Sequence, residues 1–426
     1  MSEIKLKREL GLFQTTLAGV GIILGAGIYV LIGAAAGITG NSIWLAFVIG
    51  AIVSLFTGFS FAELSSIFPK DSAEYTYTEK SFGRVIAFFI GYLVLLSSVI
   101  SAPAVAIGFS GYLGSLLNID QTILISMALI LILSCVNFRS IKDSSWMNVV
   151  CTFIEIGGLL IIIALGIFKG FSPSHQINYF EMPNGFMGVL QTSALVFFAF
   201  LGFESVVKLS EETKNPTKII PKALILSVII STILYIAVAI SAVTVLDWQT
   251  LAASKAPLAD VASTLLGNNA FILLSIIALF STANTVLICL ISGSRALYGI
   301  SHEYKKLNIF TKVHTIYKTP YNAVLFVLII SLLFCLVKQI DIVAELTNFT
   351  IFVTFAFVNL SLIFLRYKSP NLQRPYKAPL NIGEFPVMAF LGILSCIFLM
   401  TQLNITVLIG GLILSLLGFV FYFFLK

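Results

Sequence analysis

The sequence predicts an all-α integral membrane protein in which twelve transmembrane helices form one domain. Hydrophobic residues make up 58% of the 426 residues, charged residues only 10%, and the mean hydropathy is +1.04. Such a composition leaves too little polar surface to cover a water-soluble globule. Apolar runs of about 20 residues also match the ~30 Å hydrocarbon core of a bilayer, whereas membrane β-strands alternate over about ten residues.

Each expected span is an apolar segment bounded by turn or stop residues. Pro69 follows the second segment, Asn215 and Pro216 follow the sixth, and Pro221 opens the seventh. No linker is long enough to separate soluble domains, so residues 1–426 are expected to form a single transmembrane domain. The twelve segments lie near residues 11–37, 42–67, 84–113, 121–137, 147–168, 187–208, 222–246, 268–298, 321–338, 342–366, 385–402 and 405–425.

Lysine and arginine are unequally distributed over the loops, and this predicts the orientation of the chain. The N-terminal segment, the even-numbered loops and Lys426 hold 22 of them, whereas the opposite side holds only Lys169, Lys255 and Lys338. Cytoplasmic loops carry the excess, so both termini of this multi-pass protein are expected on the cytoplasmic side of the cell (plasma or inner) membrane. The net charge of +6 then reflects topology, and no nucleic-acid partner is expected.

The first span contains poor helix formers where a membrane helix should be most regular. Residues 21–33 read GIILGAGIYVLIG, with Gly25, Ala26 and Gly27 at the centre. The spacing excludes the dinucleotide fingerprint GxGxxG. Either Gly21 and Gly25, four residues apart, let another helix pack closely, or the helix is unwound and its free backbone groups bind a solute, as in secondary transporters.

A similar interruption in the sixth span favours the unwound helix. The stretch ALVFFAFLGFESVVKLSEETKNP has Gly202 at mid-membrane and Glu204 two residues later. Paired interruptions five spans apart predict two repeats, residues 11–168 and 187–366, followed by two extra spans at 385–425. Repeats with an odd number of spans enter the membrane from opposite sides, so these repeats are expected to be inverted.

Broken helices expose backbone groups that recognise charge. A half-helix beginning at Gly27 presents free N–H groups and the positive end of its dipole, and one ending near Phe200 presents free C=O groups and the negative end. An anionic group would bind at the first break and a cationic group at the second. Because α-amino acids carry both groups on one carbon, the two breaks predict an amino acid as the small-molecule partner.

Four stretches of the chain resemble the amino acid-polyamine-organocation (APC) superfamily of transporters, which shares its fold with the bacterial leucine transporter LeuT. They are GIILGAGIYVLIG in span one, FAELSSIFP with EYTYTEKSFG after span two, FFAFLGFESV with SEETKNP and IPKAL around span six, and STANTVLICLISGSRALYG in span eight. They follow the family's order within residues 11–366. The resemblance implies a secondary active transporter that moves amino acids by alternating access and needs no cofactor.

The resemblance also implies which residues form the site. The substrate carboxylate would bind the backbone of span one and the ammonium the carbonyls of span six, while spans three, six, eight and ten line the side-chain pocket. Either Phe200 or Phe203 would act as a gate, and Phe200 is preferred. The expected substrate-binding residues are Ile23, Gly25, Ala26, Gly27, Ser97, Ser98, Phe198, Ala199, Leu201, Phe203 and Asn284.

Span three departs from the family's cationic branch, which resembles GWDLxLEY and holds a basic side chain with an acid. Here the frame reads GYLVLLSS, so Ser97 stands where that acid would be. Burying a lysine or arginine side chain without a counter-ion is costly. With Ile100, Ala102 and Pro103 nearby, neutral amino acids with small or apolar side chains are expected. Amino acid exchange, and cationic amino acids or polyamines as substrates, remain alternatives.

Span five carries an acid at mid-bilayer, in the stretch NVVCTFIEIGGLL. Some proton-coupled relatives have a lysine there, whereas here the residue is Glu155. An intramembrane acid is a functional candidate by default. Three roles are open: Glu155 takes up the proton that drives uptake, its carboxylate helps to hold a cation, or it is a protonated acid bonded to a neighbouring span. If Na⁺ were the coupling ion, the hydroxyls of Ser281, Thr282 and Thr285 would hold it. No other metal ion is expected.

The remaining polar residues have structural as well as functional explanations. Glu204 stands at a helix start, where a carboxylate is favoured. A second set of charges either locks the loops of a gate near the cytoplasmic face or forms a solvated surface: Glu63, Glu211, Glu212 and Arg295. The chain has no HExxH or GxSxG motif and no paired intramembrane carboxylates, so an enzyme is not expected. A channel would need a continuous pore, and a sensor that does not transport would need an added signalling domain.

Overall fold

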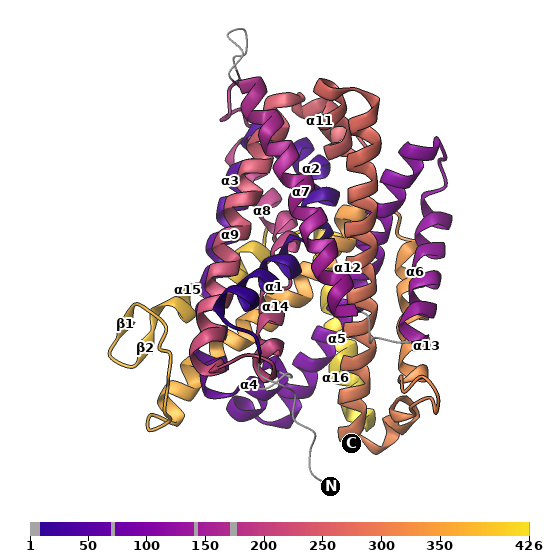
Figure 1. The fold of residues 1–426 in the computed structure, drawn as a ribbon. Helices are drawn as coiled ribbons and strands as arrows, with labels where there is room; N and C mark the ends of the chain where they lie inside the picture. Colours follow the sequence, from indigo (N-terminus) through magenta and orange to yellow (C-terminus); the bar gives the residue numbers. More distant parts are fainter. Residues whose placement is uncertain (1–8, 70–72, 140–143, 171–176, 426) are drawn as a thin grey trace.

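The computed structural model describes residues 9–69, 73–139, 144–170 and 177–425. These residues form a bundle of long helices that run between two ends of the molecule (Figure 1). In this part of the chain, nine helical stretches are long and apolar enough to cross a membrane, and four shorter apolar helices accompany them. The all-helical membrane fold is therefore confirmed, while the count of twelve spans and their inverted repeat stay predictions.

Every predicted segment contains helix. In two of them the helix is interrupted, and these are the first and the sixth. The elements in chain order are α1 (Leu12–Leu24) and α2 (Ala26–Thr39), α3 (Ile43–Ile67), α5 (Arg84–Leu117), α6 (Thr122–Arg139), α7 (Ser144–Gly170), α8 (Gly185–Val196) with the 3-10 helices η2 (Phe197–Phe200) and η3 (Phe203–Glu211), α9 (Pro216–Val245), α12 (Asn268–Glu303), α13 (Tyr321–Cys335), α14 (Ile340–Lys368), α15 (Val387–Met400) and α16 (Ile405–Leu425).

Short elements fill the connections, and the apolar pattern did not predict them because they are brief or polar. They are η1 (Gly40–Ser42), α4 (Ala73–Phe82), α10 (Trp248–Ala253), α11 (Pro257–Leu266), η4 (Lys305–Thr311) and the hairpin of β1 (Asn381–Ile382) with β2 (Phe385–Pro386). The two strands pair antiparallel, with Ile382 opposite Phe385. The predicted start of the seventh span at Pro221 is wrong, because α9 begins at Pro216 and Pro221 lies inside the helix. Proline is tolerated at the first position of a helix, where its missing N–H would have no partner within the helix.

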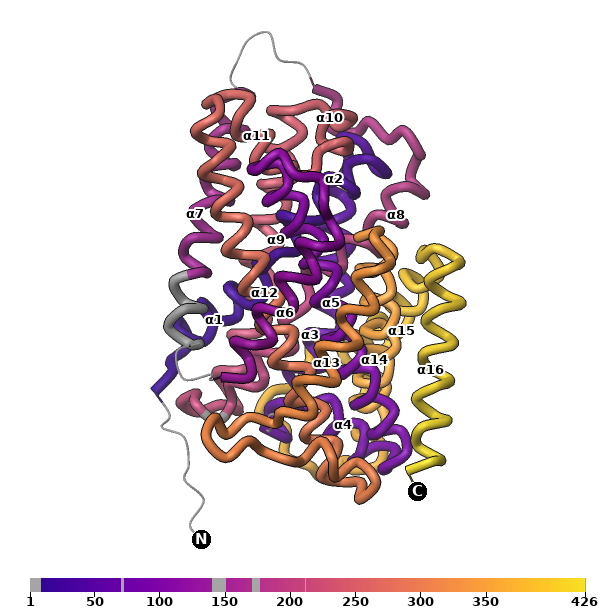
Figure 2. The backbone as a smooth tube through the Cα atoms, turned by 90° about the vertical axis from the view of Figure 1, so that its right-hand side faces the viewer, coloured from indigo at the N-terminus to yellow at the C-terminus, as the bar shows by residue number. Residues whose placement is uncertain are grey.

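The two ends of the described chain, at Glu9 and Leu425, lie at the same end of the bundle (Figures 1 and 2). The backbone N–H of Glu9 donates to the carbonyl of Glu212 at 2.9 Å, and the Lys306 ammonium donates to the carbonyl of Phe424 at 2.5 Å. The connections after the sixth and the eighth predicted spans therefore share this end with the termini, as the lysine and arginine pattern requires. Lys5, Lys7 and Arg8 lie outside the described residues.

The apolar side chains divide into a buried set around the two breaks and an exposed set on the outside. Ile23, Leu24 and Phe197 are at most 2% exposed, whereas Phe423 is 72% and Leu416 is 64% exposed. Helix α16, which carries these last two, lies at the edge of the bundle (Figure 2). An apolar outer face of this kind suits contact with lipid.

Candidate functional site

The first helix break is a single residue wide. Helix α1 ends at Leu24 and α2 begins at Ala26, so Gly25 is the cap of both. The Ala26 N–H donates to the Thr285 hydroxyl of α12 at 3.1 Å. One of the N–H groups expected to bind a substrate is therefore already used by the protein. Helix α2 therefore begins one residue before Gly27, the predicted start of the second half-helix.

The second break lies between two 3-10 helices. Helix α8 ends at Val196, η2 continues to Phe200, and η3 begins at Phe203. Gly202 has φ +113°, and a Cβ at this position would lie 3.0 Å from the Ile22 carbonyl oxygen, so the position requires glycine. The part of this span after Gly202 is thus a 3-10 helix, and Glu204 lies in its first turn.

The two breaks approach each other closely. A Cβ on Gly27 would lie 2.5 Å from the Cα of Ala199, so only glycine permits this contact. The buried Tyr235 of α9 bridges the same region: its hydroxyl lies 2.6 Å from the carbonyl oxygen of Ile23 and 2.8 Å from that of Ala199. A hydroxyl has one proton, so Tyr235 can donate to one carbonyl at a time. This tyrosine joins both interrupted spans to α9.

A cavity of about 130 Å³ opens at the two breaks. Of the eleven predicted substrate-binding residues, all except Phe203 line it. Its lining residues are Gly21, Ile22, Ile23, Gly25, Ala26, Gly27, Ser97, Ser98, Ser101, Phe198, Ala199, Leu201, Gly202, Glu204, Ser205, Asn284, Thr285, Ile288, Cys289, Ser292 and Ile351. The cavity therefore draws on α1, α2, α5, the interrupted sixth span, α12 and α14.

Two predicted aromatic residues lie away from the cavity. The Phe200 ring packs against Tyr235 at 5.3 Å between centroids, and the Phe203 ring packs against Phe355 at 5.2 Å and Phe61 at 5.9 Å. Neither lines the cavity. Both rings fill the apolar interface between the sixth span, α3, α9 and α14, and in this structure Phe200 does not cover the site.

Sequence reasoning missed part of the polar wall of the cavity. Ser101 follows Ser97 by one helical turn, and Cys289 and Ser292 follow Thr285 at spacings of four and seven. These are the positions that share one face of a helix, so helical spacing from the predicted residues would have found them. The hydroxyls of Ser97, Ser98 and Ser101 all donate to backbone carbonyls of their own helix, which leaves their oxygens as acceptors.

Glu204 is the charged side chain among the residues that line the cavity. Its Oε2 accepts the Gly202 N–H at 2.9 Å. This contact satisfies a backbone donor at the start of η3, which is the capping role that the sequence allowed. The same carboxylate also lies on the cavity wall, so its structural and functional explanations are compatible.

Glu155 lies outside the cavity lining, on α7, and is 1% exposed. Among the described residues, neither oxygen of its carboxyl group has a hydrogen-bond partner, and the same holds for the hydroxyl of Ser281, which faces it from α12. The Tyr29 hydroxyl donates to the backbone carbonyl of Glu155 at 2.8 Å. Two buried polar groups face each other here without well-formed hydrogen bonds, which is unusual.

The other hydroxyls considered for Na⁺ are engaged in their own helix. The Thr282 hydroxyl donates to the Ala278 carbonyl at 2.6 Å, and the Thr285 hydroxyl donates to the Ser281 carbonyl at 3.0 Å. Their oxygens still have free lone pairs. Thr282 and Ser281 lie in the same turn of α12 as Thr285, which lines the cavity.

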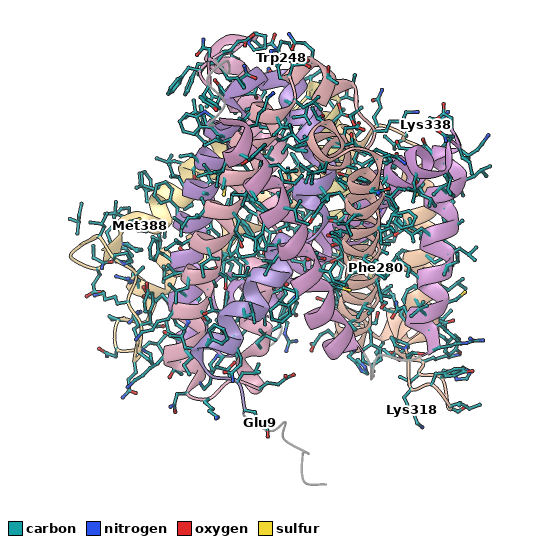
Figure 3. All side chains as sticks on the ribbon, turned by 45° about the horizontal axis from the view of Figure 1, so that its top comes forward. Glu9, Trp248, Phe280, Lys318, Lys338 and Met388 are labelled. Atoms are coloured by element: carbon teal, nitrogen blue, oxygen red, sulfur yellow. The ribbon has the colours of Figure 1, made fainter. Side chains whose placement is uncertain are left out.

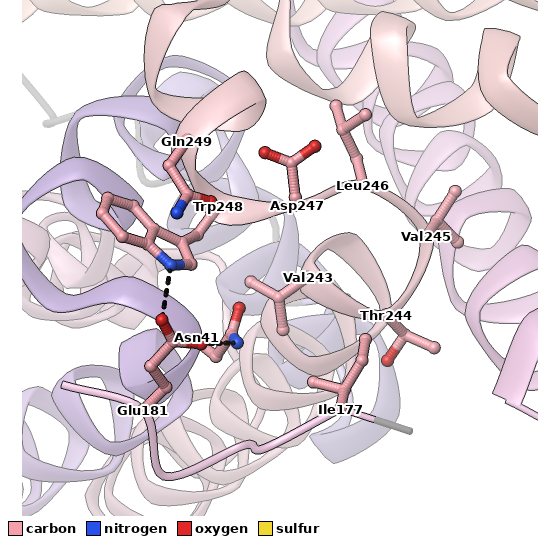
Figure 4. A pocket seen from close by; sticks show the side chains of 10 residues that line it. All are labelled: Asn41, Ile177, Glu181, Val243, Thr244, Val245, Leu246, Asp247, Trp248 and Gln249. Atoms are coloured by element: carbon pink, nitrogen blue, oxygen red, sulfur yellow. Dashed lines mark hydrogen bonds between the residues drawn. The ribbon is translucent and has the colours of Figure 1, made fainter. Parts of the chain in front are cut away.

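A larger hollow, of about 250 Å³, lies where α9 meets α10 (Figure 4). Helix α10 lies at the end of the bundle opposite to the termini (Figure 2). Its acids are already engaged: Glu181 accepts from the side-chain amide of Asn41 at 2.8 Å and from the indole of Trp248 at 3.1 Å. The Thr250 N–H bonds to Asp247 and holds the pKa of that carboxyl below its usual value. We assign the site to the smaller cavity because it contains both breaks.

Comparison with known proteins identifies the family. A family model described as amino acid permease matches residues 10–423. The branched-chain amino acid permease BcaP of Bacillus subtilis is 32% identical over 99% of this chain and 93% of the relative. A methylthioribose transporter of the same species is 28% identical over 93% of this chain and 89% of that protein. Cationic amino acid transporter 4 of Mus musculus is 29% identical over 88% of this chain and 63% of that protein.

All three relatives are named as transporters, and the matches extend over most of this chain. The resemblance read from the four sequence stretches is therefore confirmed, and so is the expectation that the protein is not an enzyme. The helix breaks and the cavity between them lie within the matched residues. The chain belongs to the amino acid permease family of the APC superfamily, a family of multi-pass membrane transporters.

Proposed function

We propose that the protein imports neutral amino acids by alternating access, with the substrate zwitterion held between the two helix breaks. The observation that carries this proposal is the cavity itself, whose walls include Gly25 and Gly27 on one side and Phe198 and Leu201 on the other. The start of α2 favours a carboxylate and the end of η2 favours an ammonium, each by ~0.3–1 kcal/mol or more when partly buried.

The backbone groups available to the substrate are fewer than the sequence implies. Ala26 gives its N–H to Thr285, and the Ala199 carbonyl lies within reach of the Tyr235 hydroxyl. We therefore assign the carboxylate to the N–H of Gly27 and the ammonium to the carbonyls of Leu201 and Phe198. The Phe198 carbonyl also accepts the Leu201 N–H at 3.3 Å, and its second lone pair would bind the ammonium.

A neutral side chain fits the rest of the cavity. Ile22, Ile288 and Ile351 contribute apolar surface, and Ser97 contributes a hydroxyl oxygen in place of an acid. Glu204 is partly committed to Gly202. The relative named for branched-chain amino acids supports this substrate class. Because other relatives are named for methylthioribose and for cationic amino acids, the uptake experiment below also includes such substrates.

We propose Glu155 as the residue that carries a coupling proton. Its carboxyl has no ion pair and no well-formed hydrogen bond among the described residues, and an isolated buried charge is expensive. Proton uptake would remove that cost. Na⁺ remains the second candidate, because the carboxylate and the Ser281 hydroxyl would both be free to coordinate it.

The cavity extends from the breaks toward the termini. Gly21 and Ile22 precede the first break, Ser205 follows the second, and Ser292 lies toward the end of α12 that leads to Lys306. With the termini in the cytoplasm of the cell, this arrangement corresponds to an inward-facing state. Outward opening would require α1 and η3 to close over the cavity.

The test is uptake of radiolabelled amino acids into liposomes that contain the purified protein. The substrates tested are the full set of amino acids, methylthioribose and putrescine. Each is tested under three conditions: an inward proton gradient, an inward Na⁺ gradient, and no ion gradient but with an amino acid preloaded inside the liposomes. We expect uptake of small or apolar amino acids that depends on the pH gradient. Uptake only with the Na⁺ gradient would replace the coupling ion, and uptake only after preloading would indicate an exchanger. No uptake of any amino acid would refute the proposed function.

A further inference from the structure

Helices α3 and α14 are joined by polar contacts at two levels, one within the two helices and one at their end toward the termini. At the first level, Ser60 donates to the Asn359 side-chain oxygen at 2.6 Å, and the Asn359 amide donates to the Thr57 hydroxyl at 2.9 Å. All three side chains are fully buried. The Asn359 side chain thus has partners for both its donor and its acceptor atoms.

Helix α15 joins the same contact. The Thr57 hydroxyl lies 4.0 Å from the Cys396 sulfur, and a Cβ on Gly392 would lie 2.7 Å from the Asn359 side-chain nitrogen. Glycine is required here because the amide of Asn359 lies against the α15 backbone. Three helices therefore meet at one buried polar group.

The second level is an ion pair seven residues further along α14. Arg366 donates to the two oxygens of Glu63 at 2.9 and 2.6 Å, and both side chains are fully buried. The Ala378 N–H donates to the same carboxylate at 2.8 Å, and the Arg374 guanidinium lies 3.4 Å from it. The Arg366 guanidinium also donates to Asn381 in the β1 strand at 2.8 Å.

The spacing of these residues connects the two levels. Thr57, Ser60 and Glu63 follow one another by three residues, and Asn359 and Arg366 are seven residues apart, so each set lies on one face of its helix. The connection between α14 and α15 is fixed as well: Arg374 donates to the carbonyls of Leu365, Ser369, Pro370 and Leu372 at 2.9 to 3.2 Å, which caps the end of α14.

The contacts around the substrate cavity differ from those between α3, α14 and α15, because they include no buried ion pair among the described residues. Helix α3 contributes no residue to the cavity lining, and α14 contributes Ile351. Across the cavity, α12 meets the first break through the Thr285 hydroxyl and Ala26, and η3 meets α3 through apolar rings such as Phe203 against Phe61. Apolar contacts are not directional and tolerate sliding, whereas separating a buried ion pair leaves two uncompensated charges.

We propose that α3, α14 and α15 move as one rigid unit throughout the transport cycle, held together by Asn359 and by the Glu63–Arg366 pair. The proposal rests on transport as the function of the protein. It assigns the opening and closing of the cavity to α1, η3 and their contacts with α7 and α12. The hairpin of β1 and β2 travels with this unit because Arg366 binds both its first strand and Glu63.

A cross-link between α3 and α15 tests the proposal. Thr57→Cys is introduced with native Cys396 retained and the other four cysteines (Cys135, Cys151, Cys289 and Cys335) replaced by serine. Oxidation with copper phenanthroline in proteoliposomes would join the two helices, as verified by mass spectrometry. We expect the oxidised protein to take up substrate within twofold of the reduced protein. Loss of uptake on oxidation that a thiol reductant restores would overturn the proposal.

The matched control joins helices that are expected to separate. The Cβ built on Gly21 of α1 lies 3.0 Å from the Cβ of Thr152 on α7, so Gly21→Cys with Thr152→Cys is expected to cross-link. Because Gly21 also lines the cavity, uptake by the oxidised variant is compared with uptake by the same variant in its reduced form, and we expect it to fall at least tenfold. If the Thr57 variant does not fold, Ser60→Cys with Asn359→Cys joins α3 to α14 in its place. Unchanged uptake by the oxidised control would also overturn the assignment of movement to α1.

A second readout separates this proposal from the proposed function. The rate of disulfide formation between position 57 and Cys396 is measured with and without substrate and under each gradient. A rigid unit gives one rate within twofold, and a rate that changes more than fivefold with conditions contradicts it. Reduced protein that takes up no amino acid would refute the proposed function while leaving this comparison intact.

Discussion

At the scale of single residues, a few polar atoms organise a mostly apolar chain. Tyr235 is the most connected to the site, because its hydroxyl lies between a carbonyl of the first break and a carbonyl of the second. Each carbonyl left without a donor in a buried position would cost about 1–3 kcal/mol. The tyrosine therefore stabilises two backbone segments that cannot satisfy themselves by regular helix.

Tyr235→Phe is expected to raise the KM for uptake at least tenfold and to lower the free energy of unfolding by about 1–3 kcal/mol. The KM rises because the carbonyls of Ile23 and Ala199 lose the one hydroxyl donor that they share. Initial uptake rates and thermal unfolding in detergent measure the two effects. Tyr179→Phe is the matched control, since its hydroxyl bonds to Thr244, outside the cavity lining. Equal KM values for the two variants would contradict the role of Tyr235.

Glu155→Gln is expected to abolish the dependence of uptake on the pH gradient. In the wild type, uptake should rise as the external pH falls, because the Glu155 carboxyl must take up a proton from the outside and release that proton inside. Glutamine keeps the shape of the side chain but cannot carry the proton. Rates measured from pH 5.5 to 8 with and without a gradient test this. A pH profile that matches the wild type would remove Glu155 from the mechanism.

Ser97→Glu is expected to give uptake of lysine or arginine that the wild type lacks. The new carboxylate would stand on the cavity wall and supply the counter-ion that a basic side chain needs when buried. Ser115→Glu on the same helix, outside the cavity lining, is the control. If neither variant takes up basic amino acids, the interpretation of span three as the specificity element is wrong.

At the scale of elements, local composition predicted where the helices break but not what holds the breaks. Glycines at positions 25, 27 and 202 are visible in the sequence because they weaken a helix locally. The Thr285 bond to Ala26 spans 259 residues of chain and has no local signal. The direction of Phe200 and Phe203 was also unpredictable, because an interrupted helix no longer follows a 3.6-residue period.

The buried ion pair of Glu63 with Arg366 should make the largest contribution to the stability of the contact between α3 and α14. Glu63→Gln leaves Arg366 charged and unpaired, which is expected to lower the free energy of unfolding by about 3–5 kcal/mol. Glu79→Gln removes the exposed contact with Arg84 at 3.8 Å and should change it by less than about 1 kcal/mol. Thermal unfolding in detergent compares the two. Similar shifts for both variants would show that Glu63 and Arg366 contribute little.

At the scale of the whole molecule, charge and fold together predict which end faces the cytoplasm. The chain ends meet the connections that carry Glu212 and Lys306, and these connections belong to the set in which the sequence concentrates lysine and arginine. Lys318 and Lys338 flank α13 and lie at opposite ends of the molecule (Figure 3). The excess of positive charge predicts that Lys318 faces the cytoplasm and Lys338 the outside.

Cysteine labelling in intact cells tests this orientation. In a background without the five native cysteines, Lys338→Cys should react with a membrane-impermeant maleimide added outside, because its end of α13 is exposed to the external solution. Lys318→Cys should react only after the cells are permeabilised. The reverse pattern would invert the molecule: the cavity, which opens toward the termini, would then face outward, and the inward-facing assignment and the direction of uptake would both have to be reversed.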